Sequence, residues 1–290
     1  MNPTLSVEVS SFPLIINGSN LVSINNTNTY SFRFPAGAVN FKRGSKVALG
    51  KINIFFSWFN ITAANNNNTL SYEWYDNVGS ATFNITIPDG YYSVSSLNSY
   101  LQQIFITNGH YLVDGSGNFV YYIELVENAT YYSVQLISSP IPTALSGGWT
   151  NPAGLTFPAV ATTPQLIIPF SNMINYLGFF PGTYPPVVQA TTYTKLSDLV
   201  PQVNTITSVI LTCNLLNNRY TNPTTILYSF TPSSVNFGDL IESSPNEYNF
   251  IEIQQGRYDE ITIRILDQAF RDIIIRDTNI LIELLIKNPE

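Results

Sequence analysis

Few residues in this sequence belong to the types that enzymes use for catalysis. The chain has one histidine, His110, and one cysteine, Cys213. His110 directly follows Asn108-Gly109, where we expect a helix to end, and the helix dipole favours a cation at that position. Cys213 closes the β-branched run 209–213, so we expect a buried thiol that packs as a small apolar side chain. Nothing nearby in the sequence would activate either side chain, and we assign no catalytic residue.

Acidic residues give equally weak signals for a metal site or a hydrolase. Residues 114–118 read Asp-Gly-Ser-Gly-Asn, but a calcium loop would need more acidic positions and a downstream glutamate, so a hairpin turn explains them better. Glu124 with Glu127, or Asp239 with Glu242, have the side chains of a glycosidase site, but sequence spacing does not bring them together. The sequence therefore predicts no metal, no cofactor and no enzymatic activity, with a β-sandwich hydrolase as an alternative.

The composition favours a protein that buries much of its surface against other proteins. Charged residues make up 11% of the 290 residues, against roughly 25% in an ordinary soluble domain. A surface of Asn, Ser, Thr and Tyr loses its water at lower cost than a charged surface does. We therefore expect self-assembly, with an extracellular β-protein of uncharged surface as the alternative.

The net charge of −7, from 12 basic and 19 acidic residues, argues against direct nucleic-acid binding. Lys42, Arg43, Lys46 and Lys51 form the only basic cluster in the sequence, which we interpret as a solvated strand edge. One cysteine excludes an intrachain disulfide, and we see neither a leader nor an apolar run of about 18 residues. We expect synthesis in a reducing cytoplasm or nucleus and no membrane span.

Alternating apolar and polar residues predict β-strands in the first third of the chain. Tyr30, Phe32 and Phe34 alternate with polar residues, residues 83–87 repeat this pattern, and residues 46–61 are rich in β-forming residues. One helix interrupts the strands, and we expect it on the outside of the sandwich. Ser93 is its predicted N-cap and Asn108-Gly109 its end. Its apolar residues recur at helical spacing: Val94, Leu97, Leu101, Ile104 and Phe105.

The remainder of the chain again has the pattern of strands and turns. A hairpin is predicted over 120–125 and 131–137, and residues 140–186 are rich in Pro and Gly, with a short strand at 165–168. Aspartates 267, 272 and 277 lie where turns are expected, and Asp closes turns by hydrogen bonding. The last strand is nearly all apolar, which is typical of burial on both faces. The four predicted strands of the last third are 205–215, 226–230, 260–266 and 279–287.

These patterns predict an all-β fold, a jelly-roll β-sandwich in which a single jelly roll is favoured. No compositional break marks a linker, so we expect one domain over 1–290. Residues 1–29 are expected as an N-terminal arm and 140–200 as an extended loop insertion. The predicted core includes Phe32, Ile85, Ile87, Ile261, Ile263, Ile282 and Leu284.

The order of several motifs resembles a viral protein family. The chain is similar, from about Tyr30 to Lys287, to the capsid proteins of polinton-like viruses, virophages and adintovirus-type elements, and closest to their penton or minor capsid protein. A Pro-Asp-Gly-Tyr turn with the helix after it is similar to the turn and helix of those proteins. The motifs that carry the resemblance are 88–93, 175–179, 182–184, 209–218, 226–230, 260–268 and 277–287.

The resemblance implies a structural subunit of the icosahedral capsid of a DNA virus. It implies a single jelly roll whose copies form a pentamer at the vertex, contact other capsid proteins in the virion, and carry no catalytic residues. A major capsid protein of this lineage would carry two jelly rolls and form trimers, which 290 residues accommodate less easily. A glycan- or receptor-binding spike is the other alternative, in which Trp58, Trp74 and Trp149 would stack on sugars.

Overall fold

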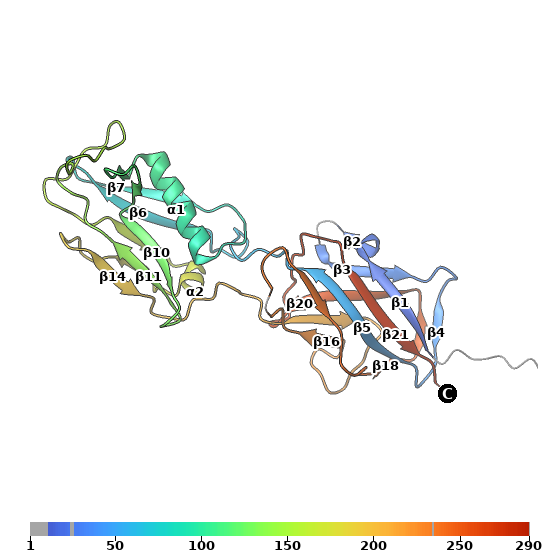
Figure 1. Ribbon diagram of the computed structural model, residues 1–290. Coiled ribbons are helices and arrows are strands. Elements are labelled where there is room, and N and C mark those ends of the chain that lie inside the picture. The colour runs from blue at the N-terminus through green and yellow to red at the C-terminus, as the bar shows by residue number, and fades with distance from the viewer. Residues whose placement is uncertain (1–10, 24–25, 234, 290) are drawn as a thin grey trace, which may run out of the picture. The chain divides into compact units, whose positions relative to one another are not determined.

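A computed structural model describes residues 11–23, 26–233 and 235–289 of the chain. The chain divides into two compact units. The first unit combines Met1–Trp58 with Ile206–Glu290, and the second is the continuous segment Phe59–Thr205. Figure 1 shows that the first unit is built of strands, whereas the second also contains a long helix. No helix among the described residues has the length and apolarity that a bilayer crossing requires.

The first unit consists of two main antiparallel sheets. In one sheet the strand order is β1-β21-β5-β17, with β18 also paired to β5, and in the other it is β16-β15-β20-β3-β2. A short pair of strands, β4 and β19, joins two of the connections. The strands of this unit are β1 (Ser11–Asn17), β2 (Leu21–Ser23), β3 (Asn26–Arg33), β4 (Val39–Phe41), β5 (Lys46–Phe55), β15 (Val209–Cys213), β16 (Ile226–Phe230), β17 (Leu240–Ser243), β18 (Ile251–Glu252), β19 (Gly256–Tyr258), β20 (Glu260–Asp267) and β21 (Leu281–Lys287).

The order of the main strands is that of a jelly roll. Taken along the chain they are β1, β3, β5, β15, β16, β17, β20 and β21, and the first pairs with the last. The second pairs with the seventh, the third with the sixth, and the fourth with the fifth. This is the pairing of one long antiparallel ribbon that has been rolled into two facing sheets, which confirms the predicted fold class. The second unit leaves the ribbon between its third and fourth strands.

Period-2 alternation builds the core of the jelly roll. Ile261, Ile263 and Ile265 on β20 are fully buried, as are Ile282, Leu284 and Ile286 on β21. The prediction that β21 is buried on both faces was wrong, because the residues between these three are only half-buried. Phe32 is half-buried rather than buried, and the neighbouring Tyr30 fills the core instead.

The second unit contains two larger sheets, a short hairpin and two helices. The sheets have the orders β13-β12-β6-β7 and β10-β11-β14, neither of which is a jelly-roll order. Its elements are β6 (Thr69–Tyr75), β7 (Ser80–Thr86), α1 (Val94–Asn108), β8 (Leu112–Val113), β9 (Phe119–Val120), β10 (Ile123–Asn128), β11 (Ser133–Ser138), β12 (Gln165–Ile168), α2 (Met173–Leu177), β13 (Gly182–Tyr184) and β14 (Tyr193–Leu196).

Helix α1 begins and ends where the sequence predicts. The side chain of Ser93 accepts a hydrogen bond from the backbone N–H of Ser96, and Gly109 ends the helix in the left-handed conformation at φ 72°. Val94, Leu97, Leu101 and Phe105 are buried on one face, as predicted. The helix packs on β10 and belongs to the core of the second unit, so its predicted place on the outside of the jelly roll was wrong.

A buried asparagine fastens the two chain ends of the second unit to each other. Asn60 is 2% exposed, and its Nδ2 donates to the carbonyl oxygens of Tyr92, at 2.7 Å, and Val203, at 2.9 Å. Its Oδ1 accepts from the backbone N–H of Tyr92 at 2.8 Å. One amide side chain near the start of this unit is therefore bonded to the backbone near its end.

The predicted domain boundaries differ from this organisation. The segment expected as an arm, 1–29, contains β1 and β2 in the first unit, and residues 1–10 lie outside the described residues. The loop insertion expected at 140–200 is the later part of the second unit and contains β12, α2, β13 and β14. The insertion thus begins at Phe59, far earlier than predicted, because a folded insertion has no linker-like composition.

Candidate assembly surface

The sheet β1-β21-β5-β17 turns one face to the jelly-roll core and the other outward. Leu14 and Ile16 of β1 point inward, so Pro13 and Ile15 point outward. The same alternation turns Leu281 and Leu285 of β21 away from the core. The strands lie side by side in Figure 1, so these outward side chains form one continuous surface, which we call the outer face.

The outer face is rich in apolar side chains. Ile15 is 52% exposed and Leu240 of β17 is 45% exposed. Register places Pro13 opposite Leu285 and Leu240 opposite Phe55. Exposed apolar side chains on a sheet are a feature of surfaces that contact other proteins.

Charges on the middle of this face compensate each other in part. Lys51 forms an ion pair with Glu242 at 2.6 Å, and Glu283 is the cross-strand partner of Lys51 on the other side. A Cβ at Gly50 would make a tight contact of 3.2 Å with Cγ of Glu283. The lysine neutralises one of the two glutamates, so the middle of the outer face keeps one negative charge.

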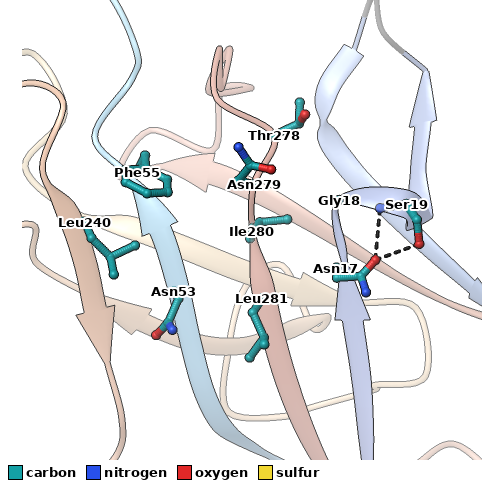
Figure 2. Close-up of a pocket in the computed structure, with 10 residues that line it drawn as sticks. All are labelled: Asn17, Gly18, Ser19, Asn53, Phe55, Leu240, Thr278, Asn279, Ile280 and Leu281. Atoms are coloured by element: carbon teal, nitrogen blue, oxygen red, sulfur yellow. Dashed lines mark hydrogen bonds between the residues drawn. The ribbon is translucent and has the colours of Figure 1, made fainter.

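A shallow depression of about 510 Å³ lies at one end of the outer face. Figure 2 shows the residues that line it. Asn17 shapes its rim, since its Oδ1 accepts hydrogen bonds from the N–H and the hydroxyl of Ser19, at 2.9 and 2.7 Å. Gly18 allows the chain to approach Thr278, whose carbonyl oxygen would lie 2.4 Å from a Cβ at position 18. No charged residue lines the depression; its residues are Asn17, Gly18, Ser19, Asn53, Phe55, Leu240, Thr278, Asn279, Ile280 and Leu281.

The other sheet of the jelly roll presents a more polar outward surface. A second depression, over β2, β3 and β20, is lined by Thr29, Ser31 and Thr262 together with Arg33 and Glu260. The hydroxyl of Ser31 donates to Glu260 Oε2 at 2.9 Å. The two outward surfaces of the sandwich thus differ in chemistry, and the apolar one is the better candidate for a protein contact.

His110 lies in the core of the second unit and not at a solvated helix end. Its ring stacks on Trp74, with 4.4 Å between ring centres and an angle of 5° between the planes. Burial lowers the pKa of His110 to about 4, so the ring is neutral near pH 7. The predicted role as a cation at the helix dipole was therefore wrong, because an imidazolium would lose its water in this aromatic environment.

Cys213 is buried as predicted, and burial raises the pKa of its thiol to about 12. Residues 114–118 form the predicted hairpin turn between β8 and β9. Oδ1 of Asp114 closes this turn by accepting from the N–H groups of Ser116 and Asn118, each at 2.8 Å. The Asp114 carboxylate therefore stabilises the turn by hydrogen bonding.

The carboxylates also have structural partners. Asp267 is 4% exposed and accepts from the N–H groups of Ala269 and Arg271, and Asp277 accepts from the N–H of Asn279. Asp272 instead pairs with Arg264. Within the described ranges no three metal-ligating side chains lie together.

The three tryptophans do not expose ring faces on which a sugar could stack. Trp58 and Trp74 are 4% and 5% exposed, and Trp149 packs partly buried against the core of the second unit. The exposed aromatic residues are tyrosines and phenylalanines, among them Tyr131 and Tyr132 in the turn between β10 and β11.

Comparison with known proteins gives structural matches only. The chain is similar to the mavirus penton protein. The TM-score is 0.45 at 8% identity, and the match covers 96% of this chain and 99% of that one. A chain of the Sputnik virophage matches with a TM-score of 0.39 at 13% identity, covering 96% of this chain and 97% of that one. No family model and no curated protein matches.

The sequence reasoning missed the outer face. Its edge strand, β1, lies within the segment that was expected to be an arm. The sequence did contain a signal, because every position from 12 to 16 is apolar. In a strand, Phe12, Leu14 and Ile16 would form one apolar face and Pro13 and Ile15 the other. A strand with two apolar faces predicts burial on both sides, and only one of these faces is covered within the chain.

Proposed function

We propose that this protein is a non-enzymatic structural subunit of a DNA-virus capsid, and that its copies assemble into the pentamer at an icosahedral vertex. The fold alone does not decide this, because jelly rolls also serve lectins and cupins. The outer face carries the proposal.

The outer face has the properties of a surface that another subunit covers. Ile15 and Leu240 expose about half of their side chains on a sheet whose opposite face is already packed. Burying such side chains contributes roughly 25 cal/mol for each Å² removed from water. The depression at its end offers amide and hydroxyl groups that give the contact direction and register.

The strand order supports a single jelly roll over the double jelly roll of a trimeric major capsid protein. Among the described residues, only the first unit has paired strands in jelly-roll order. The second unit interrupts that jelly roll between two strands instead of following it as a second one. A pentamer is therefore the expected oligomer and a trimer the alternative.

The test is the mass of the full chain at micromolar concentration, by native mass spectrometry and light scattering. We expect a pentamer for the natural chain and a monomer for Ile15→Asp, because the aspartate would have to be desolvated in the contact. Val22→Asp is the matched control, since Val22 is 58% exposed on β2 in the other sheet.

A trimer would contradict the vertex assignment, and a natural chain that remains monomeric would contradict self-assembly altogether. Equal loss of assembly in Ile15→Asp and Val22→Asp would place the contact somewhere other than the outer face. Circular dichroism of both variants shows whether each remains folded.

A further inference from the structure

Charge is divided very unevenly between the two units. The second unit has seven acidic residues and one basic residue, Lys195, which gives it a net charge of −6. The first unit has 12 acidic and 11 basic residues, a net charge of −1, and together they make up the −7 of the chain. The net charge of the whole chain argued against a polyanionic ligand, but the first unit taken alone is nearly neutral.

Three connections of the jelly roll meet at one end of the sandwich. They are residues 34–45, 214–225 and 244–259, and backbone hydrogen bonds join them. The N–H of Ile253 donates to the carbonyl of Ser45, and the N–H of Gln254 donates to that of Leu215, both at 2.8 Å. Figure 1 shows β4, β18 and the C-terminus at this end. The chain departs for the second unit from the other end of β5.

The basic residues of the first unit gather at this end, which we call the basic end. Among the described residues, seven cations lie there and none of them forms an ion pair. Four acidic residues share the end: Glu247, Glu252, Asp259 and Glu260. The seven cations are Arg33, Lys42, Arg43, Lys46, Arg219, Arg257 and Lys287.

Two lysines at the basic end lie opposite each other on neighbouring strands. Lys46 and Lys287 are direct cross-strand partners at the ends of β5 and β21. Like charges opposite each other destabilise a sheet, so this arrangement is costly unless an anion lies over it. Glu252 is the partner of Lys46 on its other side but forms no ion pair with it.

Four of the cations away from the basic end are neutralised within the chain. Lys51, Lys195, Arg264 and Arg271 each form an ion pair at 2.6 to 2.8 Å. The contrast between paired cations away from the basic end and unpaired cations at it points to a ligand that supplies the missing negative charge.

Exposed aromatic rings accompany these cations. Tyr220 is 98% exposed and directly follows Arg219, and Tyr248 is 56% exposed in the third connection. Cations that neutralise phosphates, together with rings on which bases stack, are the two components of single-strand recognition. An acidic peptide would use the cations but would have no use for the rings.

We propose that the basic end of the jelly roll binds single-stranded nucleic acid, with the cations on phosphates and Tyr220 stacked on a base. This proposal concerns the first unit and does not rest on the capsid role. It replaces the expectation, drawn from net charge, that the protein has no contact with nucleic acid.

The experiment measures anisotropy of a fluorescent 20-nucleotide single strand with the full chain at several salt concentrations. For four phosphate contacts, affinity should fall roughly 50-fold between 50 and 200 mM salt. The triple variant Lys42→Gln, Arg43→Gln, Lys46→Gln should lower the slope of log affinity against log salt by about 2. The triple variant Lys51→Gln, Lys195→Gln, Arg264→Gln loses the same charge elsewhere and should keep the slope.

Tyr220 separates nucleic acid from other polyanions. Tyr220→Ala should weaken binding at least about fivefold, and Tyr220→Phe should retain it, because the ring is what stacks. Three results would overturn the proposal: no binding at 50 mM salt, equal losses in the two triple variants, or polyglutamate that binds as tightly as the oligonucleotide. Tyr220 is almost fully exposed, so its substitution tests the contact without disturbing the fold.

Discussion

The hydroxyl of Tyr72 and Nδ1 of His110 share a hydrogen bond of 2.7 Å inside the core of the second unit. Asn108, the last residue of α1, donates in turn to the Tyr72 oxygen at 2.7 Å. Trp74 and Phe83 enclose the imidazole, with ring centres at 4.4 and 4.6 Å. One polar chain therefore ties the end of α1 to strand β6 within an aromatic cluster.

This cluster should make the second unit sensitive to acid. The pKa of His110 falls from its usual 6.5 to about 4 on folding, so between these values the unfolded state binds more protons. The free energy of unfolding should be highest above pH 6.5 and should decrease by up to about 3 kcal/mol as the pH falls to about 4. Urea unfolding followed by tryptophan fluorescence at pH 7, 6 and 5 measures the decrease.

His110→Phe provides the control for this acid sensitivity. The variant retains an aromatic ring but has no group that titrates, so its stability should depend less on pH over the same interval. Parallel pH dependence of the natural chain and the variant would assign the effect to other residues.

Replacement of Asn60 should loosen the second unit. Asn60→Ala leaves the carbonyl of Val203 and the N–H of Tyr92 without this partner, whereas the carbonyl of Tyr92 still accepts from the hydroxyl of Tyr176. Unsatisfied buried groups cost roughly 1–3 kcal/mol each, so we expect a loss of at least about 2 kcal/mol. Asn68→Ala is the control, because Asn68 makes one bond of 3.4 Å to Ile87 and should cost far less. Hydrogen exchange, measured segment by segment, should show faster exchange in Phe59–Thr205 for Asn60→Ala alone.

Two glycines with similar backbone angles should respond differently to alanine. Gly178 has φ 80° and its Cβ would lie 2.2 Å from the carbonyl oxygen of Leu199, whereas Gly154 has φ 87° and nothing within 4 Å. Gly154→Ala should cost about 1 kcal/mol for the left-handed conformation alone. Gly178→Ala should cost at least about 3 kcal/mol, because backbone must also move. Equal melting temperatures for the two variants would contradict the close approach at Gly178.

Cys213 should react with thiol reagents only when the jelly roll opens. It is 1% exposed, and burial raises the pKa of its thiol to about 12, so almost no thiolate is present at pH 8. The rate of modification by a disulfide reagent should rise with urea in parallel with the unfolding of the first unit. Fast and complete modification of the native chain would contradict the burial of β15.

Local features of this fold were predictable from the sequence. The bounds of α1 follow from Ser93 and Gly109, whose side-chain and backbone preferences act within one turn of the helix. Strand β16 begins and ends at the predicted residues, Ile226 and Phe230. In each case the deciding interactions lie within a few residues of one another.

The division into two units was not predictable in the same way. Trp58 is buried in the first unit and Phe59 begins the second, so no polar or flexible segment marks the boundary. The pairing of β1 with β21 joins the two ends of the described chain, and no local pattern specifies that neighbour. The outer face depends on this pairing, and for that reason the sequence did not reveal it.

The position of β21 has a consequence for the growing chain. This strand lies between β1 and β5, and it is synthesised after every other described strand. The second unit is a continuous segment and can fold earlier, but the first sheet has a gap until residue 287 has emerged. Until β21 has paired, the chain therefore lacks the outer face on which we propose that neighbouring subunits make contact.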